Sequence, residues 1–514
     1  MKKKKDWFKV RGYQHIGISL LYKDRKWVYG YVRNIDKIAE HAFLPLIYKP
    51  FKTERCKRNF ENPSKKRIRE PKIRPICYAN HLDASIYSYY AFILVKKYDD
   101  YVKSKPFNKS ITAYRQLEVD DAGKIRNKCN IDFAKDVFEY IKENCTANGL
   151  AVLTFDVEKF FDNLDPIILK KCWIRVLGSD KCLSKDHYAV YKNVVRYSYV
   201  HENDLFNLFK NEIPCSKKDG TLVKRKIIHS RYMHNHNAMG YCDKTGIKKI
   251  RDSGIIIEHR KDSSIDEKLR MRGIPQGLPI SSVLANIYML DFDSAIYEKV
   301  NIENGFYNRY CDDVIVVCPI DKADSIKNYI LERIKDLKLN IQEKKTNVYY
   351  FKHQANGSLY CEHAVLGKRK ALEFLGFQFD GQRILLKSSS VSSFYCKLMR
   401  SVHRGGFYAI NINTKEKYKL FTRKLYKRFT RFGMKRSLRY KRDPNDTSKF
   451  VRSTKYNWGN YLSYAHNASR IMKDKGIKNQ LRHSNSILVK VIKRKISVIN
   501  KVMYARSLKD QQYN

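Results

Sequence analysis

The chain has 514 residues, of which 43% are hydrophobic, and this proportion excludes a disordered chain. Its length suggests about three domains or one enzyme with several lobes. With 103 Lys and Arg against 52 Asp and Glu, the net charge is +51. A charge of that size repels itself unless a polyanion neutralises it, so nucleic acid is the expected partner and an anionic membrane surface is the alternative.

Neither a membrane span nor a secretory signal is predicted. The longest apolar runs, such as "YYAFILV" (residues 89–95), are far shorter than a bilayer requires. The basic start "MKKKKDWF" is not followed by a secretory apolar region. The twelve cysteines include no CxxC pair, which favours free thiols in a reducing cytosol. We therefore expect a cytoplasmic protein that is not inserted in a membrane.

The first elements in chain order are an N-terminal extension (residues 1–50) of unclear fold, a hairpin and a helix. In "KKRIREPKIRPICY" (residues 65–78), basic residues alternate with Ile around Glu70 and Pro71, which predicts a hairpin with one cationic face. Helical spacing of Leu82, Ile86 and Ile93 then predicts a core helix.

The next segment, "AVLTFDVEKFFDNLDP" (residues 151–166), starts as a short apolar strand that ends at Asp156. A helix-like stretch follows to about residue 200. Residues 201–269 are charged and predicted to be an irregular insertion. This insertion contains a cluster of candidate zinc ligands, His229, His234, His236 and Cys242. Their spacing matches no established zinc finger, so a surface or RNA-contacting loop is the default interpretation.

The third part of the chain contains a Gly/Pro-rich loop (residues 272–280) that leads into a helix. In "FYNRYCDDVIVV" (residues 306–317), adjacent Asp312 and Asp313 precede an apolar strand, which predicts a hairpin with the acids at its turn. An amphipathic helix with Ile326, Ile330 and Ile334 on one face follows, and residues 371–384 form a further hairpin.

From residue 391 to the end, about thirty Lys and Arg face only five acids, with Tyr and Phe interleaved. This composition predicts a basic, mainly helical domain that grips a phosphate backbone and stacks on bases.

The acidic pair has two interpretations. Alone, it is a solvated turn. If two strands of one antiparallel sheet bring Asp156 to Asp312 and Asp313, the acids repel one another unless hard divalent cations lie between them. Two Mg²⁺ ions held in this way can activate a 3′ hydroxyl and stabilise a leaving pyrophosphate. Cationic help at the triphosphate would come from the predicted fingertip residues, which are Arg67, Arg69, Lys72 and Arg74.

An ordered series of motifs over about residues 67–384, three fifths of the chain, resembles a bacterial reverse transcriptase. "KIRPI" resembles the fingertip, "FDVEKFF" the first catalytic motif and "GIPQGLPISSVLANIYM" the loop that positions template and nucleotide. "RYCDDVIVV" resembles the second catalytic motif, "LKLNIQEKKT" the lysine-bearing motif and "LEFLGFQFDG" the primer-grip hairpin. Together, in this order, they are far more specific than any one of them.

The resemblance implies a right-hand polymerase of the α+β class. Fingers and palm, with an antiparallel catalytic sheet, would occupy residues 51–390 with the insertion at 201–269. A basic, mainly α-helical thumb or C-terminal domain would occupy residues 391–514.

The resemblance also implies the site. Asp156 and Asp312 would be ligands of both Mg²⁺ ions, with help from the Val157 carbonyl, and Asp313 would be a supporting carboxylate. Phe161 matches the aromatic gate that excludes ribonucleotides, with Phe160 as competitor. The remaining matches are the nucleotide-loop residues Gln276 and Gly277, the pyrophosphate proton donor Lys345 with Lys344 as its neighbour, and the triphosphate clamp Arg74.

Within this family, Cys311 and the segments "AYRQL", "NIDFAKDVF" and "NWGNYLSYAHNA" resemble the defence-associated class, formerly the unknown group and similar to the abortive-infection enzymes. "QGLPIS" departs from the retron-like "QGAPTS". The class implies an antiphage enzyme that copies a companion non-coding RNA, which is both template and scaffold, into cDNA from dNTPs. Length and the basic C-terminal domain most resemble the type-nine systems, which make homopolymeric DNA, with type two next. A homo-oligomer on the RNA is a further expectation.

Some members of the wider class start DNA on a protein tyrosine, which motivates the hypothesis that Tyr513 in the terminal "KDQQYN" primes synthesis. The competing interpretation is an incidental tyrosine among 37. The sequence is also compatible with a catalytically silent RNA-binding scaffold and with a retron or group II intron type of reverse transcriptase. An RNA-directed RNA polymerase is disfavoured by the bulky Phe161.

Overall fold

The computed structural model falls into two compact units. Unit 1 comprises Met1–Arg115, Thr154–Val316 and Asp324–Thr346, and unit 2 comprises Gln116–Leu153, Val317–Ala323 and Asn347–Asn514. The structure describes residues 6–57, 68–121, 123–179, 181–217, 219–412, 417–434, 438–442, 450–456 and 459–512.

Unit 1 holds most of the helices that precede residue 340. They are α1 (Arg25–Arg33), α2 (Ile35–Ala39), α3 (His81–Lys103), α5 (Phe160–Asn163), α6 (Pro166–Leu177), α7 (Lys185–Val195), α8 (Glu202–Phe209), α9 (Gly246–Asp252), α10 (Glu267–Arg270), α11 (Ser281–Tyr288), α12 (Leu290–Ile302) and α13 (Ala323–Asp336). Its strands are β1 (Leu46–Lys57), β2 (Ile68–Tyr78), the end of β5 (Leu150–Asp156), β6 (Ser198–His201), β7 (Ile213–Ser216), β8 (Leu222–Arg225), β9 (Ile257–Glu258), β10 (Phe306–Tyr310) and most of β11 (Asp313–Pro319).

Local sequence explains where several of these helices begin and which face they bury. Helix α6 begins at Pro166, whose fixed φ suits a first helical position, and the Asp165 carboxylate caps it by accepting from two backbone N–H groups. It ends at Gly178, which adopts the left-handed conformation. The predicted amphipathic helix is α13, and Ile326 and Ile330, one helical turn apart, are fully buried.

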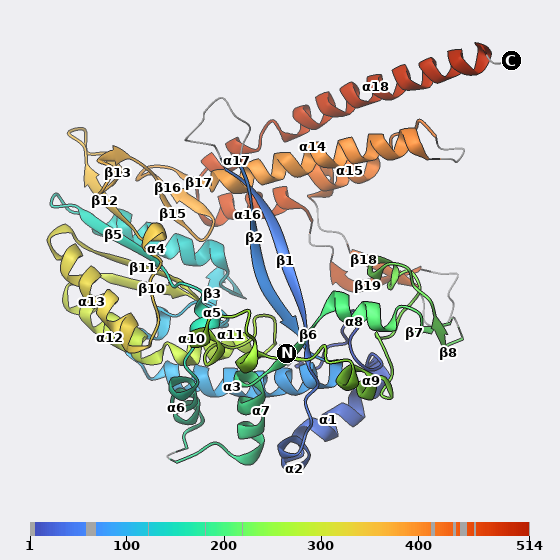
Figure 1. The fold of residues 1–514 in the computed structure, drawn as a ribbon. Coiled ribbons are helices and arrows are strands. Elements are labelled where there is room, and N and C mark those ends of the chain that lie inside the picture. The colour runs from blue at the N-terminus through green and yellow to red at the C-terminus, as the bar shows by residue number, and fades with distance from the viewer. Residues whose placement is uncertain are drawn as a thin grey trace. The chain divides into compact units, whose positions relative to one another are not determined.

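The fingers are a long two-stranded ribbon, which Figure 1 shows as β1 and β2. The prediction of a hairpin within residues 65–78 is wrong, because Ile68–Tyr78 is one continuous strand paired antiparallel with Leu46–Lys57. Glu70 and Pro71 do not turn the chain. Proline has no N–H to donate, and it is tolerated in a strand at a position where the sheet requires no donor. Strand β1 also pairs with β6 and β6 with β9, giving the order β2-β1-β6-β9.

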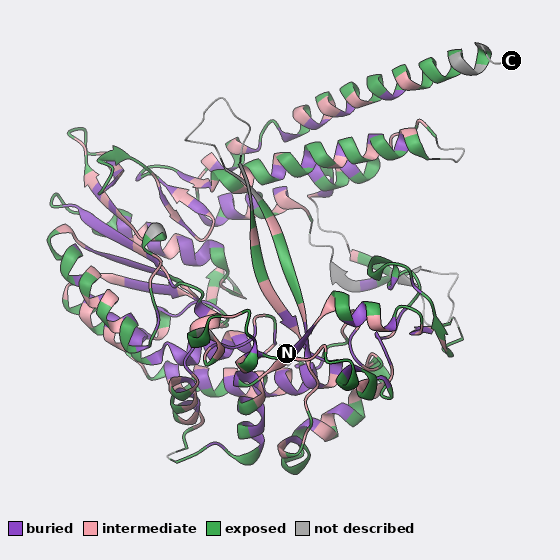
Figure 2. Cartoon of the chain, in the orientation of Figure 1, coloured by how far each residue is buried: buried purple, intermediate pink, exposed green. Residues whose placement is uncertain are grey.

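The central sheet brings together strands that are far apart in sequence. In unit 1 the strand order is β10-β11-β5, and β10 and β11 are consecutive strands joined at Cys311 and Asp312. Strands β5 and β11 are buried along most of their lengths (Figure 2). Their Val- and Ile-rich sequences suit strands covered on both faces, and their ends carry the acidic residues.

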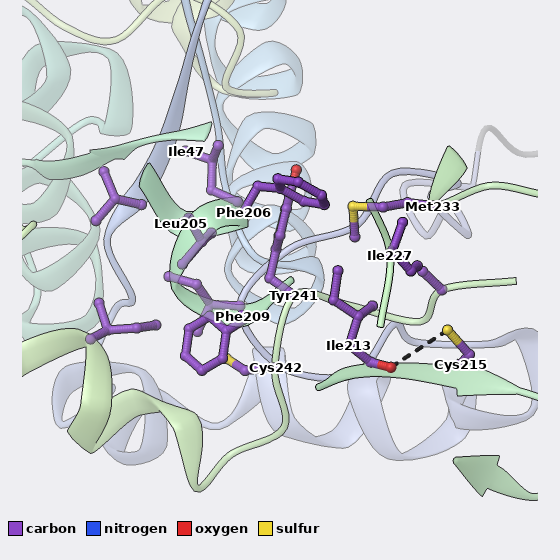
Figure 3. Close-up of a cluster of buried hydrophobic side chains, with 14 residues drawn as sticks. Ile47, Leu205, Phe206, Phe209, Ile213, Cys215, Ile227, Met233, Tyr241 and Cys242 are labelled. Carbon is purple, nitrogen blue, oxygen red and sulfur yellow. Dashed lines mark hydrogen bonds between the residues drawn. The ribbon is translucent and has the colours of Figure 1, made fainter. Parts of the chain in front are cut away.

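The insertion at residues 201–269 is more ordered than its charge pattern predicts. It contains α8, β7, β8 and α9, which surround a buried cluster that includes Phe206, Phe209, Ile213 and Tyr241 (Figure 3). These apolar residues follow neither a helical nor a strand period over any long stretch, so periodicity could not reveal them. The prediction of an irregular segment is therefore wrong for much of the insertion.

Unit 2 combines small sheets with a helical C-terminal part. Its helices are α4 (Asn130–Asn144), α14 (Ser388–Asn411), α15 (Arg423–Phe429), α16 (Tyr461–Ile471), α17 (Gly476–Gln480) and α18 (Ser484–Gln512). Its strands are β3 (Glu118–Asp121), β4 (Lys124–Asn127), the start of β5, β12 (Asn347–His353), β13 (Leu359–His363), β14 (Lys368–Arg369), β15 (Leu372–Phe374), β16 (Phe377–Phe379), β17 (Ile384–Leu386), β18 (Leu438–Arg442) and β19 (Phe450–Tyr456).

The hairpin predicted at residues 371–384 is confirmed as β15 paired antiparallel with β16, to which β17 adds a third strand. The two long helices α14 and α18 pack along each other and confirm the mainly helical character of the basic C-terminal part (Figure 1). The α+β fold class is confirmed. Within the described ranges, no helix is both long enough and apolar enough to cross a bilayer.

Candidate active site

The ends of β5 and β10 meet at two aspartates that are 156 positions apart in the chain. Asp156 is the last residue of β5, and its side chain is 21% exposed. The N–H of the next residue, Val157, donates to the carbonyl of Asp312 at 3.2 Å. The structure therefore brings Asp156 and Asp312 together, as the motifs predict, while Asp313 is the exposed first residue of β11.

The turn that carries Asp312 has an unusual backbone conformation. Cys311 has φ of +62°, a left-handed conformation that a side chain with a Cβ rarely adopts. Its carbonyl accepts a hydrogen bond from Arg309 Nη1 at 3.0 Å. Burial and the neighbouring Asp312 carboxylate raise the pKa of the Cys311 thiol to about 12. The thiol therefore stays neutral at physiological pH and does not compete with the carboxylates for a cation.

Arg309 is fully buried and is held by an ion pair inside the palm. Its guanidinium pairs with Asp293 through two hydrogen bonds of 2.6 Å, and Tyr307 donates to the same carboxylate. Asn286 accepts from Arg309 Nη1 and donates to the carbonyl of Ala113. The pKa of Arg309 is raised because the attraction of Asp293 outweighs the effect of burial. This network fixes the Cys311 carbonyl and so the position of Asp312.

The sequence reasoning missed this network, although two signals were present. An arginine in the strand "FYNRY" and an aspartate in the helix "MLDFDSAI" each lie among apolar residues. Charged residues are almost never fully buried unless they are paired. Two charges of opposite sign in neighbouring buried elements could therefore have been predicted to form a pair.

Lys345 reaches the carboxylate of Asp156. Its Nζ lies 2.8 Å from Oδ1 and 2.9 Å from Oδ2 of Asp156. The backbone holds it there, because Gln342 donates its N–H to the Asp156 carbonyl and Lys345 donates to the Gln342 carbonyl. The predicted lysine is thus part of the site. The side chain of Lys344 lies outside the described residues.

The residues present fit a divalent cation. The Lys345 ammonium rests on both carboxylate oxygens of Asp156, which shows that this carboxylate accepts a cation in this geometry. Mg²⁺ typically takes one or two carboxylates and completes its coordination with water and phosphate oxygens. In the described part of the chain, no group of three or more His, Cys, Asp and Glu could hold a metal. The donor set therefore matches Mg²⁺ shared with a triphosphate better than a closed protein site.

The nucleotide loop is bonded to the fingers. The N–H of Cys77 on β2 donates to the carbonyl of Gln276 at 2.8 Å, and Gln276 is half-buried. Gly277 has φ of +111°, and a Cβ there would lie 2.4 Å from the Cys77 carbonyl oxygen. Only glycine allows the loop to approach β2 this closely. The predicted loop residues are thus positioned by the strand that carries Arg74.

Arg74 projects from the fingers ribbon opposite Phe51 and is exposed. No acidic partner for Arg74 occurs among the described residues, which leaves its guanidinium available to an anion. Of the other predicted fingertip cations, Arg67 and the side chain of Arg69 lie outside the described residues.

The two neighbouring phenylalanines of the first motif have different environments. Phe160 is 3% exposed and belongs to the core, whereas Phe161 is only half-buried. The carbonyl of Phe161 accepts from Ile274 N–H at 2.8 Å, so the residue is fixed beside the nucleotide loop. Burial thus excludes Phe160 and leaves Phe161 as the candidate gate.

The four candidate zinc ligands of the insertion are not part of this site. His229, His234 and His236 are exposed, whereas Cys242 is buried in the cluster of the insertion, so they do not form a metal site in the described chain. Tyr513 lies outside the described residues.

The fingers ribbon, the central sheet with its paired acids and the basic helical part define a right-hand polymerase. Residues 191–379 match the family model described as reverse transcriptase (RNA-dependent DNA polymerase). A reverse transcriptase domain is therefore present, and the predicted enzyme class, an RNA-directed DNA polymerase, is confirmed for that domain. The matched stretch includes Gln276, Asp312 and Lys345 but begins after Asp156, whose assignment depends on the geometry above.

No curated protein matches the chain. Among solved structures, an apo telomerase from Candida tropicalis is similar at 11% identity over 94% of this chain and 69% of that one, with a TM-score of 0.38. The same telomerase truncated from its C-terminal domain gives 12% identity, 70% and 60% coverage and a TM-score of 0.37. Telomerase from Candida albicans, in complex with a TWJ fragment of telomeric RNA, gives 12% identity, 93% and 69% coverage and 0.36. This chain thus spans only 60% of the truncated telomerase. Such low TM-scores leave the fold assignment to the topology and the family match.

Proposed function

We propose that the chain is an RNA-directed DNA polymerase with its active site at Asp156 and Asp312. The observation that carries the proposal is the hydrogen bond from Val157 N–H to the Asp312 carbonyl, 3.2 Å long, which joins two distant strand ends. Two carboxylates close together repel each other and destabilise a fold unless a cation neutralises them. A catalytic Mg²⁺ between Asp156 and Asp312 explains why the chain carries both acids at this strand junction.

Asp156, Asp312 and the Val157 carbonyl would hold the Mg²⁺ ions, and Asp313 would support them. Bound Mg²⁺ supplies activation of the attacking 3′ hydroxyl and charge neutralisation at the leaving pyrophosphate. Lys345, whose ammonium already lies at Asp156, carries a proton that it can donate to the pyrophosphate.

The other residues select and orient the nucleotide. Arg74 faces solvent on the fingers and clamps the triphosphate. The loop at Gln276 and Gly277 supports the base and sugar. The half-buried ring of Phe161 excludes a 2′ hydroxyl, so the product is DNA.

At a finer level, the chain copies a companion non-coding RNA, which is also its scaffold, in antiphage defence. The resemblance of the motifs around Cys311 and residues 113–138 supports this role, and the net charge of +51 suits a large bound RNA. Within the defence class, the type-nine systems remain the better match, with homopolymeric DNA as product and Tyr513 as the candidate primer. A homo-oligomer on the RNA in the cytoplasm belongs to the same proposal.

The second candidate function is an RNA-binding scaffold without catalysis, and the charge excess of the C-terminal part favours it equally. dNTP incorporation by purified protein with its co-purifying RNA separates the two. We expect the double variant Asp312→Ala with Asp313→Ala to lose incorporation but keep the RNA. Asp204→Ala, which removes an exposed acid on α8, should keep both. Equal incorporation by wild type and the double variant would refute the enzymatic proposal.

A further inference from the structure

A cavity of about 300 Å³ lies in unit 1, on the side of the nucleotide loop where Gln276 and Pro275 face β6. Its size is at the lower end of small-molecule sites. It has room for a nucleobase or a nucleoside but is small for a nucleoside triphosphate. The polymerase mechanism above uses none of its other lining residues.

Aromatic rings form one wall of the cavity. The ring centroids of Tyr48 and Tyr199 are 5.4 Å apart, and those of Tyr197 and Tyr199 are 6.4 Å apart. His259 stacks on Tyr197 with centroids 4.5 Å apart and an angle of 16° between the rings. A row of rings of this kind offers stacking surface to a flat ligand.

Most polar groups of the wall already have partners. Tyr199 donates its hydroxyl to Asp262, which also accepts from the backbone N–H and the hydroxyl of Ser264. His259 Nε2 lies 3.2 Å from the Arg272 carbonyl, which can only accept, so Nδ1 accepts from the Tyr197 hydroxyl at 3.1 Å. These contacts fix the rings of Tyr197 and Tyr199 in place and leave their hydroxyls unavailable as donors to a ligand.

The Asp162 carboxylate is not among these partnered groups. The side chain of Asp162 lines the cavity, and its carboxylate has no hydrogen-bond partner among the described residues. Burial raises the pKa of Asp162, and the Lys159 ammonium offsets this only in part. The backbone of Asp162 lies close against Gly273, where an added Cβ would be 2.6 Å from the Asp162 carbonyl oxygen. A half-buried acceptor that faces the cavity without a protein donor points to a donor supplied by a ligand.

We propose that this cavity binds a nucleobase that stacks on the Tyr48, Tyr197 and Tyr199 wall and donates N–H groups to Asp162. Guanine is the best match, because its two adjacent N–H donors can pair with both carboxylate oxygens. Uracil is a poor match, since its single ring N–H lies between two carbonyl groups that repel a carboxylate.

The lining argues against the other ligand classes. A phosphate is disfavoured because Lys159 is the only Lys or Arg among the described residues that line the cavity, and its charge is directed to Asp162. An organic cation would suit an aromatic wall with a carboxylate, but a chain of charge +51 repels free cations. A base that is part of a nucleic acid is not repelled, because its phosphate backbone is attracted to the positively charged chain.

The base can come from two sources, a free nucleoside or an unpaired base of the RNA template. The second source rests on the proposed function, because the cavity adjoins the loop that positions template and nucleotide. The two sources are separated by two experiments on the full-length chain, of which only one requires polymerisation.

In the first experiment, guanosine and uridine are titrated against the protein and binding is followed by saturation-transfer NMR. We expect guanosine to bind in preference to uridine. Asp162→Asn should weaken guanosine binding at least tenfold, the factor expected of one hydrogen bond to a charged group. Asp204→Asn, which removes the same charge from an exposed site, should bind guanosine as the wild type does.

In the second experiment, primer extension is measured on two RNA templates that differ only in the nucleotide after the copied one, guanosine or uridine. If the template supplies the base, guanosine lowers the KM for the template at least tenfold and Asp162→Asn removes the difference. A response in the first experiment alone identifies a free nucleoside as the ligand.

The proposal is overturned if neither experiment distinguishes guanosine from uridine, or if tetramethylammonium displaces guanosine. It also fails if Asp162→Asn lowers the thermal unfolding temperature, because a purely structural carboxylate would behave in that way. Extension of the uridine template by the wild type shows that the polymerase assignment stands even when this inference fails.

Discussion

The buried pair of Arg309 and Asp293 is expected to position the catalytic turn as well as to stabilise the palm. Arg309→Met leaves the Asp293 carboxylate at 0% exposure, with the Tyr307 hydroxyl as its one remaining side-chain partner among the described residues. Breaking a buried ion pair in this way costs about 3–5 kcal/mol. At about 2.1 cal/mol/K per residue over the roughly 300 residues of unit 1, this lowers the unfolding temperature by about 5–8 °C.

A second variant separates stability from positioning. Arg309→Met combined with Asp293→Leu removes both charges, and apolar replacements of buried ion pairs are often tolerated. We expect the double variant to recover at least half of the lost unfolding temperature. Primer extension should stay low, because the Cys311 carbonyl still lacks the donor that fixes the turn.

Calorimetry and single-nucleotide extension on the same samples provide the two measurements. If the double variant extends primers at the wild-type rate, Arg309 does not position Asp312. If the single variant unfolds within about 1 °C of the wild type, the pair is not buried as described.

Three further substitutions test the nucleotide site. Phe161→Ala should reduce discrimination between dNTPs and NTPs at least tenfold in competition kinetics, and unchanged discrimination would exclude it as the gate. Gly277→Ala places a Cβ 2.4 Å from the Cys77 carbonyl at a positive φ. Strain of about 1–3 kcal/mol should then raise the KM for dNTPs roughly tenfold, whereas a wild-type KM would show that the loop can move away. Lys345→Met removes the ammonium from Asp156 and should slow incorporation by about 10²-fold. A wild-type rate of incorporation would contradict its role as proton donor.

The convergence of Asp156 and Asp312 could be predicted in part from the sequence. Asp156 and Asp312 each follow or precede a short apolar strand, and such strands pair in few ways, so their convergence could be anticipated. The partner of the fingertip strand could not be anticipated. Residues 46–57 gave no strand prediction because their mixed basic and aromatic pattern has no clean alternation.

Burial resolved choices that the sequence left open. Phe160 and Phe161 are identical and adjacent, and only their environments distinguish a core ring from a half-exposed one. The partners of Arg309 and the acceptor Asp162 depend on contacts between segments far apart in the chain. No local pattern encodes such contacts, because side-chain pairing across elements depends on the packed arrangement.

The central claim is that Asp156 and Asp312 form one metal-dependent polymerase site. Its most direct test is single-turnover incorporation of one dNTP, with Mg²⁺, by Asp156→Asn and by Asp312→Asn on a defined RNA template. Both variants should fold and bind the template as the wild type does, yet incorporate on the order of 10³-fold more slowly. Incorporation at the wild-type rate by either variant would contradict the account.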